Sequence, residues 1–89
     1  MQDIESTPQD GYLVFVGNMA PGMTESELER MLKPLGNINF IRLARDQQTG
    51  YPLGYAFVAM RHKHEAIRVV RKAQETKIGN RYLIARSIF

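Results

Sequence analysis

The sequence contains no cysteine among its 89 residues and only two histidines, His62 and His64. Without cysteine the chain forms neither a disulfide nor a cysteine-based metal or thiol centre, and two histidines do not suggest a histidine-rich metal site. No apolar run approaches the ~20 residues of a membrane-spanning helix, so no membrane contact is expected. The first ten residues include no basic residue, which argues against a targeting peptide. The expected compartment is the nucleus or the cytoplasm.

The net charge of +3 is unevenly distributed along the chain. Three of the nine acidic residues lie in the first ten positions, whereas all 12 basic residues lie beyond them, which leaves +6 on residues 11–89. Residues 61–86 alone hold eight basic and two acidic side chains. A basic surface of this kind suits a polyanionic partner, although an ordinary solvated, lysine- and arginine-rich surface would give the same count.

Apolar patterning predicts a flexible polar tail over residues 1–10 and one domain over residues 11–89. Strands are expected over residues 12–17, 38–45, 53–60 and 81–88. Thr24 and Glu27 have the spacing of a capping box, so a helix should begin at Thr24 and end or distort near Pro34, with Gly36 as its stop. A second helix is expected over residues 62–74, with its apolar side formed by Ala66, Ile67, Val70 and Ala73.

The order strand–helix–strand–strand–helix–strand predicts an α+β fold, a ferredoxin-like βαββαβ sandwich. Right-handed crossovers place both helices on one face of a four-stranded antiparallel sheet. Because side chains alternate along a strand, the helix-facing side should hold Val14, Val16, Ile41, Ala56, Val58 and Ile84. The other face, called here the open face, should hold Leu13, Phe15, Tyr55, Phe57 and Leu83, joined by Leu53, Ala59 and Ala85. An aromatic patch facing water usually marks a binding surface.

Two segments resemble the motifs of a known family. L-G-Y-A-F-V-A-M, from Leu53 to Met60, resembles the eight-residue motif of the RNA recognition motif family, which reads basic, glycine, aromatic, small, aromatic, aliphatic, any residue, aromatic. V-F-V-G-N-M, from Val14 to Met19, is similar to the six-residue motif of the family's first strand. The resemblance extends over residues 12–88. Leu53 replaces a basic residue, and Met60 replaces an aromatic one at a position that faces the helices.

The resemblance implies that Phe15, Tyr55 and Phe57 are platforms on which bases of single-stranded RNA stack. The missing charge at Leu53 should be supplied elsewhere. The candidate phosphate-binding residues are Arg42, Arg45, Lys77, Arg81 and Arg86. The turn D-Q-Q-T-G-Y-P further resembles family members that bind pyrimidine-containing RNA. A monomer without a cofactor is expected.

Two other classes of function are weighed against RNA binding. Catalysis is not expected. The acylphosphatases share the βαββαβ order, but residues 17–22 lack the arginine of their phosphate loop. His62 and His64 lie two apart and so do not share a helix face, which argues against a metal or acid–base site formed by the pair. The second alternative is a protein-binding member of the same fold, with a polypeptide partner on the apolar sheet face or on the helices. Some family members bind a tryptophan of a partner peptide through an acidic first helix and an Arg-x-Phe motif. Such an acidic helix would be formed here by Glu25, Glu27 and Glu29, but Arg81-Tyr82-Leu83 departs from the Arg-x-Phe motif.

Overall fold

The computed structural model describes residues 11–89, so the tail predicted over residues 1–10 lies outside the described residues. The elements are β1 (Tyr12–Gly17), α1 (Glu25–Leu32), the 3₁₀ helix η1 (Lys33–Leu35), β2 (Ile38–Arg45), β3 (Pro52–Met60), α2 (Lys63–Glu75), β4 (Lys77–Ile78), β5 (Arg81–Tyr82) and β6 (Ile84–Ser87). The predicted order is confirmed, except that β4 is added and the predicted last strand divides into β5 and β6.

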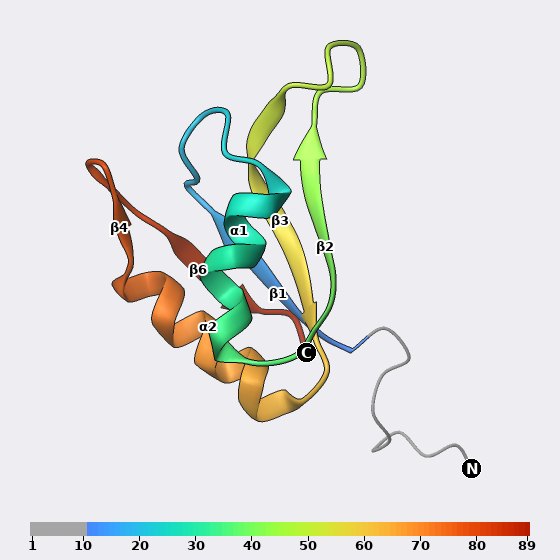
Figure 1. Cartoon of the computed structure of the whole chain (residues 1–89), viewed down its shortest axis with the longest axis vertical. Coiled ribbons are helices and arrows are strands. Elements are labelled where there is room, and N and C mark those ends of the chain that lie inside the picture. Colours follow the sequence, from blue (N-terminus) through green and yellow to red (C-terminus); the bar gives the residue numbers. More distant parts are fainter. Residues whose placement is uncertain (1–10) are drawn as a thin grey trace.

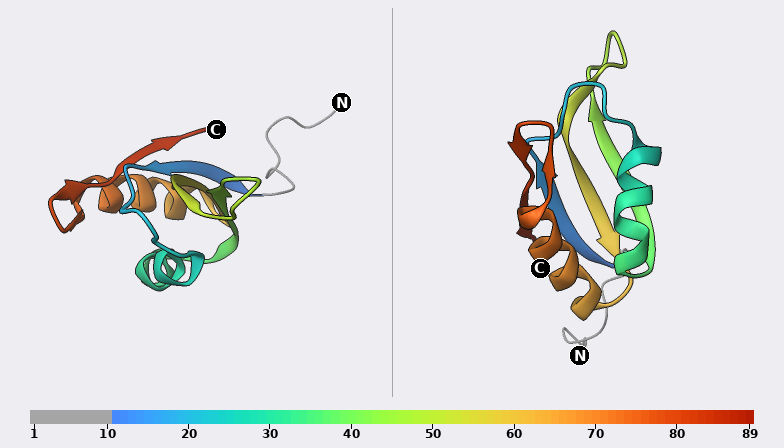
Figure 2. Two further views of the ribbon diagram at one scale, coloured as in Figure 1. Left: turned by 90° about the horizontal axis from the view of Figure 1, so that it is seen from above. Right: turned by 60° about the vertical axis from the view of Figure 1, so that its left-hand side comes forward.

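Four strands form an antiparallel sheet in the order β2-β3-β1-β6, and β4 and β5 form a separate hairpin. Both helices lie on the same face of this sheet (Figures 1 and 2). Within residues 11–89, no helix covers the opposite face. The arrangement confirms the predicted ferredoxin-like sandwich and its open face. Neither α1 nor α2 has the length and apolar character needed to cross a membrane.

The hydrophobic core lies between the sheet and the two helices. From the central strands it receives Val14, Val16, Ala56, Val58 and Met60, all fully buried. From the helices it receives Leu28, Leu32, Ala66, Val69 and Ala73. Burying a large aliphatic side chain contributes about 1.5–3 kcal/mol, so this packing strongly favours one orientation of β1 and β3. Since neighbouring side chains on a strand point to opposite faces, the same packing directs Phe15, Tyr55 and Phe57 away from the helices.

The first helix begins and ends where its sequence predicts. The Thr24 side-chain oxygen accepts a hydrogen bond from the Glu27 N–H at 3.3 Å, and Glu27 Oε1 accepts one from the Thr24 N–H at 2.9 Å. This reciprocal capping box satisfies two amides that have no partner inside the helix. Pro34 lies in η1, and Gly36 follows directly. The helix therefore tightens at Pro34 and stops at Gly36, as expected.

The entry to α2 is fixed by Glu65, a buried carboxylate. Its Oε2 accepts a hydrogen bond from Asn37 Nδ2 at 2.9 Å, and its Oε1 accepts one from the His62 N–H at 3.1 Å. Burial acts to raise the pKa of Glu65, but the hydrogen bonds from Asn37 and His62 outweigh it and hold the pKa below the ordinary value of 4.5. His62 is the residue that precedes the first turn of α2, so the helix begins one residue after the predicted start.

The prediction for the apolar side of α2 is wrong at one residue. Ile67 is 43% exposed, whereas Val69, absent from the prediction, is fully buried. The segment A-I-R-V-V places apolar residues at 66, 67, 69 and 70, which is a wider spread than one helical stripe holds. Packing against the sheet selects Ala66 and Val69 for the core and leaves Ile67 outside.

The prediction for the fourth strand is wrong in its extent and in its faces. Residues 81–88 do not form one strand but divide into β5 and β6 at Leu83, whose N–H donates to the Thr76 carbonyl oxygen at 3.1 Å. Beyond this break Ala85 pairs with Val16 and faces the core. Leu83 is likewise buried, and Ile84 is 45% exposed. Leu83 and Ala85 therefore leave the predicted open face, and Ile84 takes a place on it.

Candidate nucleic-acid interface

A row of four side chains crosses the open face, one from each strand of the sheet. Arg42 of β2 pairs with Phe57 of β3, Phe57 pairs with Phe15 of β1, and Phe15 pairs with Arg86 of β6. Directly paired residues in an antiparallel sheet share a face. The sheet therefore places two phenylalanines at the centre of the face and one arginine on each side of them.

Tyr55 lies beside this row and completes a cluster of three rings, called here the aromatic platform (Phe15, Tyr55 and Phe57). The ring centroids of Phe15 and Tyr55 are 5.9 Å apart, those of Phe15 and Phe57 5.7 Å, and those of Tyr55 and Phe57 6.3 Å. These separations are typical of rings in favourable contact. Tyr55 is 38% exposed, and the two phenylalanines are half-buried. The rings thus support one another while each keeps surface in contact with solvent.

Gly17 leaves the space that the Phe15 ring occupies. A Cβ atom at Gly17 would come within 2.8 Å of Phe15 Cε2, which is closer than real Cβ contacts. The absence of a side chain at Gly17 therefore lets the Phe15 ring lie over the end of β1.

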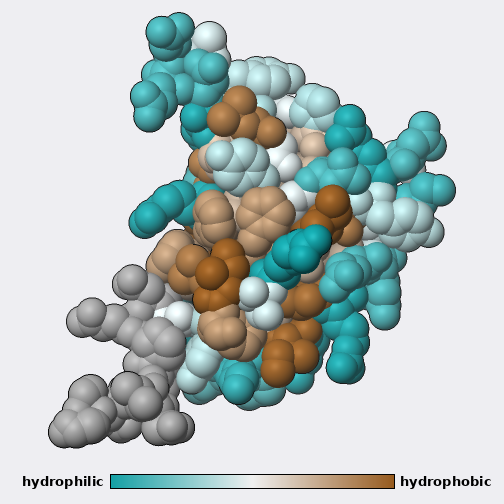
Figure 3. Space-filling model, turned by 180° about the vertical axis from the view of Figure 1, so that it is seen from behind, coloured by the Kyte–Doolittle hydropathy of each residue, from teal (hydrophilic) through white to brown (hydrophobic). Residues whose placement is uncertain are grey.

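Figure 3 shows the open face, seen from the side opposite the helices: hydrophobic side chains gather near its centre, and hydrophilic ones lie around much of its edge. Leu13 pairs with Ala59 on this face, as predicted, although Ala59 is fully buried there. Leu53, at the start of β3, is half-exposed and adds a further apolar side chain to the surface near Tyr55.

The C-terminal residues do not cover the aromatic platform. The Phe89 ring packs edge-on against Tyr12, with centroids 5.5 Å apart. The Ile88 N–H donates to the Leu13 carbonyl oxygen at 2.9 Å, so the chain continues alongside β1 up to its end. Among the described residues, the three rings contact one another and leave their outer surfaces free for a planar ligand.

Phe40 is a residue of the open face that the sequence analysis did not single out. It pairs with Ala59 and is half-buried, and the Arg42 guanidinium carbon lies 5.1 Å from the centre of its ring. A cation over an aromatic ring is stabilised by about 0.5–1 kcal/mol at exposed sites, so Phe40 holds Arg42 in place. The sequence signal that could have identified Phe40 is the alternation in I-N-F-I-R, which puts residues 40 and 42 on one face.

The remaining basic candidates lie away from the row. Arg45 donates to the Gly50 carbonyl oxygen at 3.0 Å and lies 3.8 Å from Glu25 Oε1 at the start of α1. Lys77 is placed 5.7 Å over the Tyr82 ring in the β4–β5 hairpin. The structure thus brings Arg42 and Arg86 together with the rings, and it gives Arg45 and Lys77 other contacts.

Arg81 belongs to a link between the hairpin and the end of β1. Its Nη1 donates to Asn18 Oδ1 at 3.1 Å, and Asn18 Nδ2 donates to the Tyr82 carbonyl oxygen at 2.7 Å. Asn18 has a positive φ of 57°, a conformation that asparagine adopts more readily than most residues. Both polar atoms of the Asn18 side chain are therefore engaged in holding the hairpin.

Comparison with known proteins gives a consistent result. The family described as RNA recognition motif matches residues 14–84. Protein elav of Drosophila melanogaster is 31% identical over 80 residues, which is 90% of this chain and 17% of that protein, so the chain spans about a sixth of its relative's length.

Two solved structures extend the comparison. The Rna15 RRM with bound RNA (GU) has a TM-score of 0.76 at 26% identity, covering 83% of this chain and 79% of that chain. The Sxl-lethal protein/RNA complex has a TM-score of 0.78 at 30% identity, covering 83% of this chain and 44% of that chain.

Proposed function

The chain belongs to the RNA recognition motif family, and from this premise we propose that it is a non-catalytic module that binds short single-stranded RNA on its open face. Phe15, Tyr55 and Phe57 stack on bases, and Arg42 and Arg86 neutralise phosphates on either side of them. The observation that carries the proposal is the cross-strand row from Arg42 through both phenylalanines to Arg86.

The physical basis of the proposal is that the open face fits the exposed bases of single-stranded RNA. Each base has a π-face that stacks on an aromatic ring, and alanine substitution of one such ring costs about 1–3 kcal/mol. A duplex hides those faces inside its own stack, whereas a single strand can lay its bases out on a sheet. Adjacent strands are about 4.8 Å apart, so the two arginines lie roughly 14 Å apart and flank more than one nucleotide. Leu53 supplies no charge, so the proposed phosphate contacts are these two arginines, which pair directly with the phenylalanines.

We further propose that the bound RNA contains pyrimidines. Support comes from the turn over residues 46–52, which is like that of pyrimidine-binding family members, and from the GU sequence in the Rna15 complex. Lys77, Arg81 and Arg45 remain candidate contacts for nucleotides that extend beyond the row. A nuclear or cytoplasmic location and a monomeric state accompany this proposal.

A protein-binding role for the same face predicts different behaviour. A polypeptide that covers the aromatic platform would exclude RNA, and affinity for any oligonucleotide would be low at moderate salt. The two flanking arginines favour RNA, because the polar rim of such a peptide site requires no pair of cations placed on both sides of the rings.

The proposal is tested by fluorescence anisotropy with labelled RNAs of about eight nucleotides, which falls within the range of single-strand binding sites on small domains. We expect a U- and G-containing single strand to bind, the same strand in a duplex to bind much more weakly, and affinity to fall as salt rises. Equal affinity for the duplex would point to charge alone, and no binding to any single strand would refute the proposal.

A further inference from the structure

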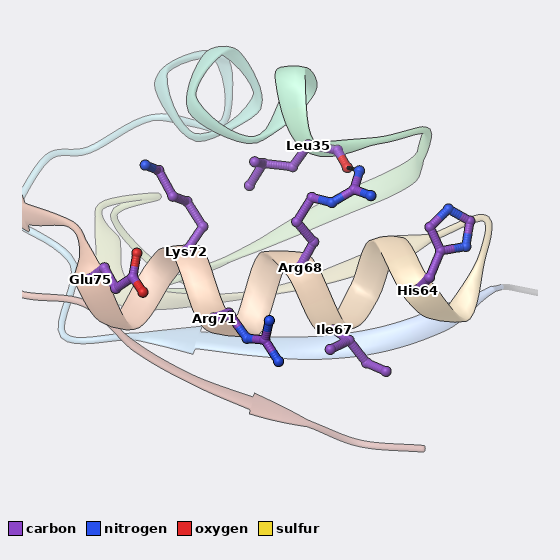
Figure 4. Close-up of a pocket in the computed structure, with 7 residues that line it drawn as sticks. All are labelled: Leu35, His64, Ile67, Arg68, Arg71, Lys72 and Glu75. Atoms are coloured by element: carbon purple, nitrogen blue, oxygen red, sulfur yellow. Dashed lines mark hydrogen bonds between the residues drawn. The ribbon is translucent and has the colours of Figure 1, made fainter.

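The outer surface of α2, on the side of the molecule opposite the open face, has two adjoining shallow depressions. One, of about 330 Å³, is lined by Leu35, His64, Ile67, Arg68, Arg71, Lys72 and Glu75 (Figure 4). The other, of about 280 Å³, is lined by Ile67, Val70, Arg71, Gln74 and Ser87 and reaches the edge strand β6. Ile67 and Arg71 belong to both depressions, so the two form one continuous surface, called here the α2 groove.

The centre of the α2 groove is apolar. Ile67 is 43% exposed, although the other large aliphatic residues of α2, Val69 and Val70, pack into or against the core. Leu35 lines the first depression, and Val70 lines the second. Covering Ile67 with an apolar side chain of a partner would be favourable, because it would remove apolar surface from water.

The α2 groove is strongly basic around Ile67. Arg68, Arg71 and Lys72 line it, His64 lies at one end, and Glu75 at the other end is its single carboxylate. Arg68 donates to the Leu35 carbonyl oxygen at 2.8 Å, which fixes its guanidinium at the edge. The only ion pair within residues 11–89 joins Arg45 to Glu25, so none of the three cations forms an ion pair with a described carboxylate.

We propose that the α2 groove binds an acidic polypeptide segment in which one apolar side chain is flanked by carboxylates. The apolar side chain covers Ile67, and the flanking carboxylates pair with Arg68, Arg71 and Lys72. Charge complementarity identifies the partner as an anion, and the exposed isoleucine at the centre favours a peptide over RNA because it offers no ring for a base to stack on. Helix α2 covers the face of the sheet opposite the open face (Figure 2), so the α2 groove and the aromatic platform are separate surfaces and both ligands bind at once.

The test is an amide chemical-shift titration of the whole chain with a peptide of about twelve residues, the length scale of helix-face recognition, in which one leucine is flanked by glutamates. Two control peptides replace the leucine with serine or the glutamates with lysines. We expect shifts at Ile67, Arg71 and Lys72 with the first peptide alone.

Matched variants separate the parts of the site. Ile67→Ser should weaken binding of the acidic peptide roughly tenfold, the effect of about 1.4 kcal/mol, and leave RNA affinity unchanged. Ile84→Ser changes an isoleucine of similar exposure, 45%, on the open face, and should leave peptide binding unchanged. Arg71→Glu should abolish peptide binding and keep the dispersion of the amide spectrum.

Four results would overturn the proposal. They are the absence of shifts on α2 with the acidic leucine peptide, equal shifts with the serine peptide, shifts of the same amides on titration with single-stranded RNA, and concentration-dependent shifts of these amides without any peptide. The third result would identify the groove as a second RNA-binding surface, and the fourth would identify its occupant as a second copy of the chain.

Discussion

Replacing both exposed rings of β3 by alanine, Tyr55→Ala with Phe57→Ala, tests the stacking mechanism. Both residues contact Phe15, and they contact each other with ring centroids 6.3 Å apart. The double variant therefore leaves Phe15 as the only ring of the aromatic platform, while the helix-facing residues of β3 stay unchanged.

The expected magnitude follows from the number of stacks that are lost. Each ring contributes about 1–3 kcal/mol to binding of single-stranded nucleic acid, so two rings contribute about 2–6 kcal/mol, or roughly 30-fold to 10⁴-fold in Kd. Contacting residues are not additive, and we expect a loss of roughly 100-fold. Three ring contacts also disappear from the fold, each worth about 0.5–1.5 kcal/mol. These contacts together contribute about 1.5–4.5 kcal/mol, which is less than the stability of about 5–15 kcal/mol of a typical domain, so we expect the variant to stay folded.

The assay is fluorescence anisotropy with the U- and G-containing strand, and thermal unfolding confirms that the variant is folded. Tyr82→Ala serves as the control, because Tyr82 is an exposed tyrosine of the β4–β5 hairpin and its side chain lies outside the row. If the folded double variant bound RNA within about twofold of the wild type, stacking on these rings would be refuted.

Three further predictions concern charge, ring placement and pH. Arg42→Ala should reduce the slope of log affinity against log salt by about 0.7, the value for one phosphate of a single strand. Arg45→Ala should change this slope less, because the start of α1 and the β2–β3 turn hold the Arg45 guanidinium. Equal slopes for the two variants would contradict the role of the row. Gly17→Ala should displace the Phe15 ring, since the new Cβ would lie 2.8 Å from that ring. We expect RNA affinity to fall severalfold with little loss of stability. Unchanged affinity would mean that the position of the ring is not important for binding. Because the pKa of Glu65 is lowered in the folded state, its contribution to stability is present above about pH 4.5 and is lost as pH falls below that value. In urea unfolding, Glu65→Gln should therefore lose less of its free energy of unfolding between neutral and acidic pH than the wild type does. An unchanged dependence on pH would show that other carboxylates dominate it.

The sequence alone was sufficient to predict the central strands and the aromatic platform. On β1 and β3, large rings alternate with small or branched residues, so only one assignment of faces buries Val14 and Val58 and leaves Phe15 and Phe57 on the open face. The capping box at Thr24 and the interruption at Pro34 are equally local signals, and both were correct.

The features that the sequence did not reveal depend on contacts between distant segments. Leu83 and Ile84 are adjacent and both apolar, so alternation alone could not decide their faces; the break in the strand, fixed by the Thr76 carbonyl oxygen, decided it. Arg45 lies on a predicted strand, but its position beside Glu25 arises from the packing of α1 against β2. The roles in RNA binding of all the predicted site residues remain predictions: Phe15, Tyr55, Phe57, Arg42, Arg45, Lys77, Arg81 and Arg86.

The most direct test of the central claim is a set of distances between base protons and ring protons, measured by intermolecular nuclear Overhauser effects in the complex with a short single-stranded RNA. We predict contacts from bases to Phe15, Tyr55 and Phe57, with chemical-shift changes at Arg42 and Arg86. A bound RNA that shows contacts and shifts on α1 or α2 alone, with the three rings unaffected, would contradict the claim that bases lie on the open face.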